Sequence, residues 1–417
     1  MCIKHTQDLY LRNMYKELSA ATLSKIANTY GTPVYVYDTD KISHQFEQLN
    51  KEFAKTNTRF FYASKALTNI NILQHILNIG CNIDCSSINE AKLAIHTGFE
   101  PNNILYTSNG IDFSEIEEAA ALGVHINIDS LSNLEKFGKK FGHSYPVGIR
   151  LRPNIMAGGN LKISTGHQSS KFGIPIEQLN EILQLVKKYN LYIRGLHIHT
   201  GSEIKDVAVF MKVADIFVDL IPHFPEVSFL DLGGGFKVAY KEKDPTTDIA
   251  ELAHEINIFL TGLEKTHLRP FECWFEPGKY LVSEAGFLVT KVNVLKDFNN
   301  IAFAGVDSGL NHLIRPMMYD AYHRIENISN TSGNKKNYTI TGNICETDTF
   351  GSDRLLHEVR EGDFLAIYNA GAYGFEMSSN YNARFKPAEV MVKEGIPQLI
   401  RKRDVFADLL RNQTPLI

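Results

Sequence analysis

The sequence predicts an α/β protein that combines a (β/α)8 TIM barrel with a second, mainly antiparallel β domain of barrel or sandwich type. Between residues 59 and 277, eight apolar, β-rich runs are each followed by a helical pattern, which is the strand count of such a barrel. Glycine-rich segments follow the seventh and eighth runs, where barrels commonly bind phosphate. After about residue 285, alternating segments replace the helical patterns, as in antiparallel sheets. An open doubly wound sheet is the alternative for the first part, and the count of eight favours the barrel.

The eight expected barrel strands are short, and small or polar residues end or directly follow them. They span residues 60–64, 82–86, 104–107, 125–128, 147–151, 193–199, 227–232 and 273–276. The segments between them are long enough for the crossover helices that parallel strands require.

The β domain is expected to use both ends of the chain. Residues 286–294 and 363–368 alternate as strands do, with few helical patterns between them. Residues 32–37 have the same strand character and precede the first barrel strand by the length of a helix. We therefore expect a barrel over residues 40–284 and a β domain over residues 1–39 and 285–417.

Charge and composition indicate a small ligand. The 417 residues carry a net charge of -4, and without a long basic run they offer no electrostatic surface for nucleic acid or anionic membrane. No stretch is apolar for long enough to span a bilayer, and the N-terminus lacks the core of a signal peptide. We expect a cytoplasmic protein that binds neither nucleic acid nor membrane.

The five cysteines are odd in number and irregularly spaced, which argues against a disulfide framework and for a reducing compartment. Cys81 and Cys85 resemble half a metal site, but no second pair at ligand spacing accompanies them. We expect two buried thiols and no metal.

Lys65 is the first candidate for chemistry, because it ends the run that begins at Arg59 and a helical pattern follows it. Barrels keep their functional groups at the carboxyl ends of the strands. A salt-bridged surface lysine is the alternative, and the apolar or small residues before Lys65 argue against it.

Glycines and a carboxylate end the last two strands. The three glycines at 233–235 let backbone amides approach an anion, although a tight strand exit explains them equally well. Glu276 needs a partner, because buried carboxylates are paired or strongly hydrogen-bonded. A protonated pyridine nitrogen and an ion pair with Arg150 or Arg152 are equal alternatives at this point.

His197 and His199 share one face of a strand. A metal pair would need a third ligand, and none occurs at useful spacing. We expect His197 to be a satisfied core histidine, and His199 to stack on an aromatic cofactor with Ser202 near its phosphate. Together with Lys65 and Glu276, the glycine loop and His199 match pyridoxal 5'-phosphate, which needs an amine, an acid for its ring nitrogen, a phosphate cradle and a stacking face.

The β domain offers a second group. Cys345 and Glu346 are adjacent, so both serve one pocket only if the chain turns there. Taken singly, they would be a buried hydrophobe and a solvated charge. Arg315 is suited to a bidentate grip on a carboxylate, and Tyr319 and Tyr373 add phenols.

With these motifs in order, the chain resembles the fold-type III pyridoxal phosphate decarboxylases, and among them the diaminopimelate decarboxylase family, over nearly its whole length. The matching segments are residues 61–66, 163–166, 170–173, 199–202, 231–235, 276–278, 307–319, 345–346, 371–373 and 377–382. So many ordered matches are far more specific than any single motif.

The resemblance implies a head-to-tail homodimer in which the barrel of one subunit and the β domain of the other form each active site. By position, Lys65 would hold pyridoxal 5'-phosphate, His199 would stack on its ring, and Glu276 would contact the pyridine nitrogen. The other residues around the cofactor would be Ser202, Gly234, Gly235, Gly278, Lys279 and Tyr373.

The resemblance also implies a substrate site and a proton donor. Substrate would contact Lys279, Arg315, Tyr319, Glu346 and Tyr373, with Glu346 at its distal ammonium. Cys345 of the partner chain would be the proton donor. Lys279 stands where the family usually has arginine, so it lacks a planar fork for a carboxylate. Thr347 replaces the commoner serine and leaves both functional side chains in place.

The function implied is decarboxylation of meso-2,6-diaminopimelate to L-lysine and carbon dioxide, the last step of lysine biosynthesis. A decarboxylase of ornithine, arginine or carboxynorspermidine is the alternative within the same fold. An enzyme like alanine racemase would need a catalytic tyrosine in place of Cys345. A non-catalytic, cofactor-binding regulatory protein is a further alternative, against which intact Lys65 and Cys345 argue.

Overall fold

The computed structural model describes residues 15–155, 166, 170–299 and 301–415. It divides into two compact units, of which one comprises Phe46–Tyr280 and the other combines Met1–Gln45 with Leu281–Ile417. Two expectations, for Cys2 and for motif residues 163–165, lie outside the described residues. Among the helices of the described residues, none combines the length and the hydrophobicity of a membrane span.

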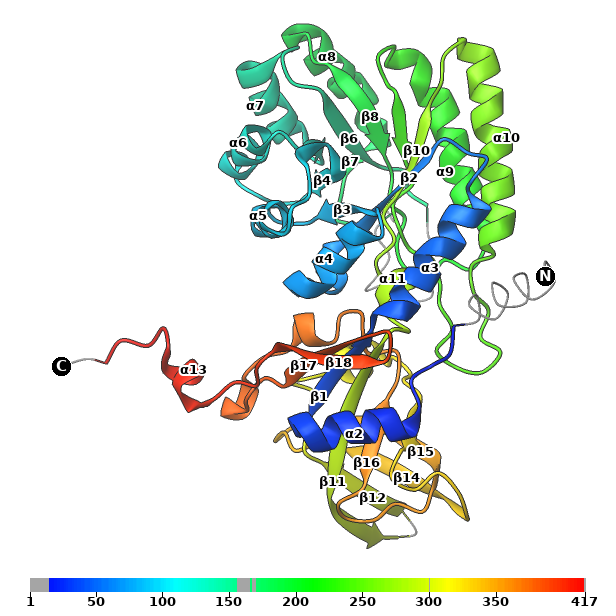
Figure 1. Cartoon of the computed structure of the whole chain (residues 1–417). Coiled ribbons are helices and arrows are strands. Elements are labelled where there is room, and N and C mark those ends of the chain that lie inside the picture. The colour runs from blue at the N-terminus through cyan, green and yellow to red at the C-terminus, as the bar shows by residue number, and fades with distance from the viewer. Residues whose placement is uncertain (1–14, 156–165, 167–169, 300, 416–417) are drawn as a thin grey trace, which may run out of the picture. The chain divides into compact units, whose positions relative to one another are not determined.

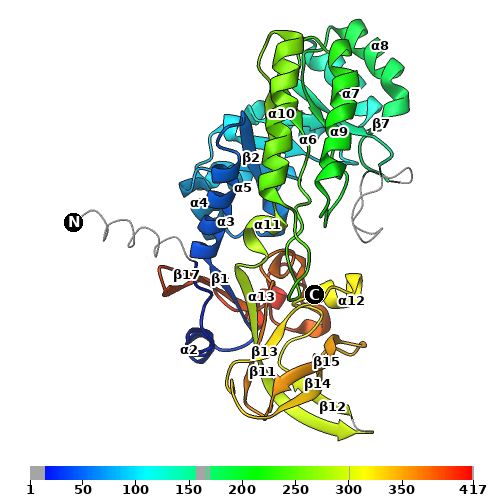
Figure 2. The same cartoon turned by 90° about the vertical axis from the view of Figure 1, so that its right-hand side faces the viewer.

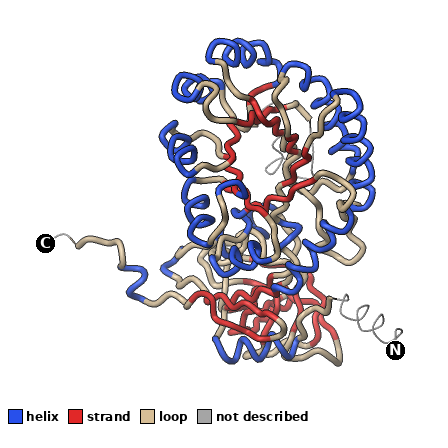
Figure 3. The backbone as a smooth tube through the Cα atoms, turned by 45° about the horizontal axis from the view of Figure 1, so that its top comes forward, coloured by secondary structure: helices blue, strands red, loops and turns tan. Residues whose placement is uncertain are grey.

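Eight parallel strands form the first unit and close on themselves. The strands are β2 (Thr58–Ala63), β3 (Asn82–Cys85), β4 (Ile104–Thr107), β5 (His125–Ile128), β6 (Val147–Arg152), β8 (Ile193–His197), β9 (Phe229–Asp231) and β10 (Glu272–Phe275). Pairing of β10 with β2 and of β5 with β6 closes the ring, which Figure 3 shows encircled by helices. The predicted barrel is confirmed, and the open sheet is excluded. A short strand, β7 (Ile174–Pro175), adds to β6.

Helices cover the barrel, one before its first strand and the others after the strands (Figure 1). They are α3 (Thr39–Glu52), α4 (Ile70–Asn78), α5 (Ile88–Thr97), α6 (Phe113–Leu122), α7 (Leu131–Phe141), α8 (Leu179–Tyr189), α9 (Val207–Leu220) and α10 (Ile249–His267). Short polar side chains begin most of them, because an oxygen at the N-cap accepts a backbone N–H that the helix itself leaves unpaired. Such caps are Asn69, Ser87, Asp112, Ser130, Asp206 and Asp248. Helices α9 and α10 lie side by side in Figure 2.

Aromatic residues from different strands close the barrel core. Phe61, Leu105, Phe229 and Trp274 form one buried cluster. The rings of Phe229 and Trp274 stack with centroids 3.7 Å apart. A Cβ at position 195 would lie 1.9 Å from the Phe229 ring, so only glycine leaves room for this stack.

The second unit is built on a mixed sheet in the order β15-β14-β12-β11-β1-β17-β18, with β16 pairing both β11 and β13. The strands are β1 (Val34–Asp38), β11 (Gly286–Phe298), β12 (Ile301–Val306), β13 (Ile325–Asn327), β14 (Lys335–Thr341), β15 (Thr349–His357), β16 (Phe364–Ile367), β17 (Ala388–Lys393) and β18 (Ile396–Arg401). Most pairings are antiparallel, as predicted. The sequence pattern did not reveal that β1 with β17 and β12 with β14 pair in parallel, because strand alternation carries no information on direction.

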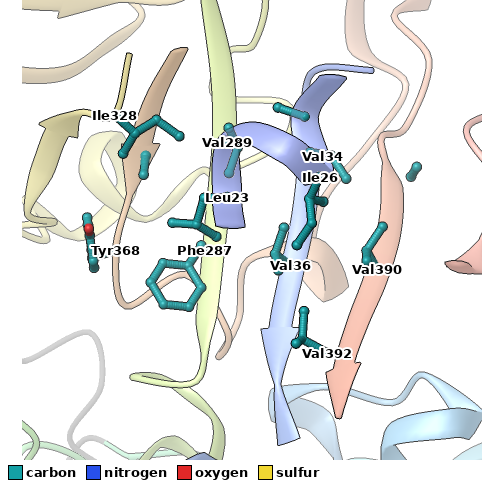
Figure 4. Close-up of a cluster of buried hydrophobic side chains, with 13 residues drawn as sticks. Leu23, Ile26, Val34, Val36, Phe287, Val289, Ile328, Tyr368, Val390 and Val392 are labelled. Carbon is teal, nitrogen blue, oxygen red and sulfur yellow. The ribbon is translucent and has the colours of Figure 1, made fainter. Parts of the chain in front are cut away.

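The N-terminal strand β1 lies inside this sheet, between β11 and β17, as its strand character predicted. Helix α2 (Ala20–Tyr30) packs its apolar face on the same strands, with Leu23 and Ile26 against valines of β1, β11 and β17 (Figure 4). Two short helices, α12 (Arg315–Tyr319) and α13 (Phe406–Leu410), lie outside the sheet order, and α11 (Lys279–Val282) spans the boundary between the units.

Candidate active site

Lys65 lies in the single turn η1 (Ser64–Ala66) that directly follows β2. Its Nζ is 4.0 Å from Oδ2 of Asp84, which is buried at the end of the neighbouring strand β3. Ser64 steadies the turn, because its hydroxyl donates to the carbonyl of Asp84 and to Oε2 of Glu90, both at 2.9 Å. The Lys65 side chain stays 42% exposed, so its amine is held beside a carboxylate without being enclosed.

Three carboxyl groups from separate strand ends meet inside the barrel. They belong to Asp84, Asp231 and Glu276. Burial, followed by the charge of Glu276, raises the pKa of Asp84 and of Asp231 well above the usual value. The guanidinium of Arg150, itself buried on β6, acts electrostatically on all three acids. Acids this close cannot all be ionised, and the raised pKa values of Asp84 and Asp231 favour their protonated forms.

His197 is fully buried beside this cluster, with Nε2 3.4 Å from Oε1 of Glu276. Among the described residues, neither ring nitrogen has a hydrogen-bond partner. The prediction of a satisfied core histidine is therefore wrong in part, since the ring is buried but not satisfied. Burial first, then the charge of Arg150, lowers the pKa of His197 well below its usual value, so the ring is neutral.

His197, Asp231 and Glu276 offer ligand atoms within 4.8 Å of one another, a geometry compatible with a metal ion. Sequence spacing did not reveal this set, because its members come from three strands that only barrel closure brings together. Arg150 already supplies these acids with a fixed positive charge, which an incoming cation would have to oppose. A singly charged organic cation would oppose Arg150 less than a divalent metal ion would, and it also has a hydrogen to donate to these acceptors.

The hydrogen bonding of the Glu276 carboxylate indicates whether these residues fit pyridoxal phosphate. Its Oε1 is buried and has no hydrogen-bond partner within the described ranges, as is also true of Oδ2 of Asp231. A buried acceptor without a donor is energetically costly. A protonated pyridine nitrogen would satisfy it. Arg152, one of the ion-pair partners considered from sequence, donates instead to the carbonyl of Ser170.

The glycine loop after β9 packs against the end of β8. Gly235 has a φ of 98°, and a Cβ there would lie 2.3 Å from the carbonyl oxygen of Gly201. The Gly234 N–H donates to Nδ1 of His199 over 3.2 Å. Because Nδ1 accepts, the neutral imidazole carries its hydrogen on Nε2. Burial, followed by the charge of Arg150, keeps the pKa of His199 well below its usual value, so the ring presents a neutral face.

The eighth strand leads to Gly278 and Lys279. The carbonyl of Pro277 accepts the Ala63 N–H at 3.2 Å, which ties this loop to the turn that carries Lys65. A Cβ at Gly278 would lie 3.1 Å from that of Ala63, so the close approach leaves little room for a side chain.

Lys279 forms an ion pair that the sequence analysis missed. Its Nζ contacts Oε1 of Glu203, whose other oxygen lies 3.1 Å from Nζ of Lys237. Burial alone would raise the pKa of Glu203, but the charges of Lys279 and Lys237 lower it. The signals available in the sequence were a carboxylate directly after Ser202 and a lysine two residues after the glycine loop.

In the second unit, Arg315 and Tyr319 begin and end helix α12. Residues four apart lie on one helix face, so the guanidinium and the phenol belong to one side of this turn. Arg315 is buried, whereas Tyr319 is half-buried. Tyr373 has a left-handed backbone, with a φ of 55°.

The chain bends at Cys345 and Glu346. Such a bend is the condition under which both side chains can serve one pocket. Asp348 shapes the bend, because its carboxylate accepts the N–H groups of Leu310 at 2.8 Å and Ile344 at 3.0 Å. The expectation of two buried thiols at Cys81 and Cys85 is confirmed, whereas Cys345 is exposed.

Both side chains of this bend contact one tyrosine. Tyr381 donates its phenol hydrogen to Oε1 of Glu346 at 2.8 Å, and its oxygen lies 3.8 Å from Sγ of Cys345. The thiol also donates to Oδ1 of Asn382 at 3.4 Å. Tyr381 and Asn382 belong to a motif that contributed to the family resemblance, but sequence alone gave them no role.

Comparison with known proteins gives consistent results. A family model described as "Pyridoxal-dependent decarboxylase, pyridoxal binding domain" matches residues 39–283. The chain is 38% identical over 413 residues to the diaminopimelate decarboxylase of Methanothermobacter thermautotrophicus, covering 95% of each protein. It is similar to the crystal structure of the Helicobacter pylori diaminopimelate decarboxylase complexed with L-lysine, with a TM-score of 0.86, 34% identity, and coverage of 93% of this chain and 98% of that one. The corresponding M. jannaschii enzyme in co-complex with L-lysine has a TM-score of 0.86 and 31% identity, with 94% of each chain covered.

Proposed function

Because the chain belongs to the pyridoxal-dependent decarboxylases, we propose that it is a pyridoxal phosphate-dependent carboxy-lyase that converts meso-2,6-diaminopimelate to L-lysine and carbon dioxide. This reaction is the last step of lysine biosynthesis. The observation that carries the substrate assignment is similarity over 95% of the chain to a diaminopimelate decarboxylase, since it includes the second unit as well as the barrel. Two related crystal structures contain L-lysine, which is the proposed product.

The barrel residues would hold the cofactor. When bound, pyridoxal phosphate supplies an electron sink for the electron pair that remains after carbon dioxide leaves. The Lys65 amine would attach it, with Asp84 keeping that amine in place. His199 would stack on the ring, and Glu276 would face the pyridine nitrogen and keep it protonated. The phosphate would be bound around Ser202, Gly234, Gly235, Gly278, Lys279 and Tyr373.

Residues of the second unit would recognise the substrate and complete the reaction. Arg315, Tyr319 and Tyr373 would bind carboxylate, together with Lys279 of the barrel. A lysine that already pairs with Glu203 serves as a point charge, without the two-point grip of arginine. Glu346 would bind the distal ammonium, and Cys345 would donate the proton that replaces the lost carboxylate.

We further propose a head-to-tail homodimer in the cytoplasm, with the barrel of one subunit and the β domain of the other forming each site. The free thiols of Cys81, Cys85 and Cys273 support a reducing compartment. Mixing a Lys65→Ala protein with a Cys345→Ala protein tests the shared site. Random hybrids would regain about a quarter of wild-type turnover, because half the dimers would hold one intact site of two. No recovery would contradict a shared site.

The substrate is tested by carbon dioxide release from meso-diaminopimelate beside ornithine, arginine and lysine. We expect turnover of the first alone, because Arg315 and Glu346 together suit a substrate with a second amino-acid head. Turnover of ornithine or arginine without meso-diaminopimelate would reassign the chain to a related decarboxylase.

A further inference from the structure

The cluster of Cys345, Glu346, Tyr381 and Asn382 contains two side chains that the proposed reaction does not yet use. Tyr381 is 42% exposed in the single chain, and its hydroxyl nevertheless contacts Glu346. The phenol lies between the thiol and the carboxylate, at 3.8 Å from one and 2.8 Å from the other. The hydrogen bond to Glu346 is the main reason why the pKa of Tyr381 is raised to about 12. The phenol therefore keeps its hydrogen at neutral pH.

Asn382 completes the contacts of the thiol. Its Oδ1 accepts the S–H of Cys345 at 3.4 Å, which fixes the direction in which that hydrogen points. The backbone of Asn382 is left-handed, with a φ of 55° inside the turn η7 (Tyr381–Ala383). Asparagine tolerates this conformation better than most residues.

We propose that Tyr381 and Asn382 are positioning residues, of which Tyr381 orients the carboxylate of Glu346 and Asn382 orients the thiol hydrogen of Cys345. The inference deepens the proposed function and rests on it for the roles of Cys345 and Glu346. It assigns both steps of substrate handling in the second unit to one turn: recognition of the distal ammonium and delivery of the proton.

The proton step that Asn382 would prepare is balanced. The bond from the substrate carbon to its carboxylate breaks, carbon dioxide leaves, and the electron pair stays with the carbon. The S–H bond of Cys345 then breaks as a C–H bond forms at that carbon, which leaves a thiolate that regains a proton from water. A thiol hydrogen with a fixed direction shortens the search for the reactive geometry.

Four variants separate the two contacts. Tyr381→Phe removes only the hydroxyl, and Tyr189→Phe is its matched control, since Tyr189 makes an equivalent 2.9 Å hydrogen bond to Glu135 on the barrel helices. Asn382→Gly removes the acceptor and accepts the positive φ without strain. Asn382→Asp restores an oxygen at the same place and also tolerates that backbone.

We expect Tyr381→Phe to raise KM for meso-diaminopimelate about fivefold to tenfold with little change in kcat, because Glu346 loses a hydrogen bond to a charged group. Asn382→Gly is expected to lower kcat with KM unchanged, and Asn382→Asp to recover most of it. Tyr189→Phe is expected to behave as wild type. If Tyr381→Phe and Tyr189→Phe changed kcat and KM to the same extent, the proposed role of Tyr381 would be wrong.

The rate of alkylation of Cys345 tests its contact with Asn382 independently of enzyme activity. In cofactor-free protein at fixed pH, iodoacetamide should modify Cys345 about twofold to tenfold faster in Asn382→Gly than in wild type, because the S–H loses its acceptor and part of its cover. Asn382→Asp should not exceed wild type, and peptide mass mapping separates Cys345 from the other thiols. An unchanged rate in Asn382→Gly would refute the inference even in an active enzyme. Faster alkylation in a protein that releases no carbon dioxide from meso-diaminopimelate would leave the contact standing and refute the proposed function.

Discussion

Replacing Glu203 with glutamine probes the ion pairs that hold Lys279 near the glycine loop. The Glu203 side chain is 17% exposed and lies 3.1 Å from Nζ of Lys237 while it also contacts Lys279. At that distance the Coulomb attraction is about 5 kcal/mol for an effective dielectric constant of about 20. Desolvation of the carboxylate offsets most of it, so a net loss of about 1–2 kcal/mol in the free energy of unfolding is expected, between exposed and buried pairs.

The stability difference between wild type and Glu203→Gln is expected to depend on pH. The two lysines lower the pKa of Glu203 below its usual 4.5. A carboxyl with a lowered pKa in the folded state stabilises the protein fully above its unfolded pKa, and this stabilisation is lost as the pH falls through the folded value. The difference between wild type and Glu203→Gln should therefore be complete at pH 7 and shrink below about pH 4.5.

Urea unfolding from pH 7 to pH 3, followed by tryptophan fluorescence of the barrel residue Trp274, measures this difference. Glu135→Gln is the matched control, because Glu135 also bridges two lysines, Lys139 at 3.2 Å and Lys188 at 3.4 Å, but on the surface. It should destabilise the protein much less. Equal effects of the two variants, or a Glu203→Gln difference that does not change with pH, would refute the reasoning.

Three further predictions concern the cofactor. Lys65→Ala should abolish turnover and the covalent mass adduct that borohydride otherwise traps on the protein; an adduct mapped elsewhere would contradict the assignment of Lys65. Asp231→Asn removes a buried carboxyl that lies beside Glu276, so cofactor affinity, measured by absorbance titration, should fall about tenfold or more; unchanged affinity and an unchanged spectrum would show that the Asp231 carboxyl has no role in binding the cofactor. Gly235→Ala places a Cβ against the carbonyl of Gly201 at a φ of 98°, and should release cofactor on dialysis at least about tenfold faster than wild type; equal retention would mean that the loop does not hold the phosphate.

Local sequence patterns were sufficient for the barrel. Lys65, Gly235 and Glu276 could be chosen because each lies within four residues of the carboxyl end of a strand. The strand character of residues 32–37 also predicted β1, whose five residues are all buried.

The interactions between distant segments could not be predicted in the same way. Asp231 reaches Glu276, and Glu203 reaches Lys279, only through barrel closure, which brings the ends of different strands together. His197 looked like an ordinary core residue because sequence reveals burial but not the absence of a hydrogen-bond partner. For Tyr381, the decisive contact depends on a left-handed turn that no pattern marked.

The position of β1 has a consequence for how the protein is made. All five residues of this strand are buried, and its partners β11 and β17 begin only at Gly286 and Ala388. On the ribosome, β1 therefore emerges hundreds of residues before the strands that cover it, and an unpaired apolar strand readily joins other chains. The barrel meets a similar delay, since β2 waits for β10. Neither unit can complete its sheet until strands late in the sequence have been synthesised. A prematurely terminated product would therefore expose its first strand and would not form a smaller working enzyme.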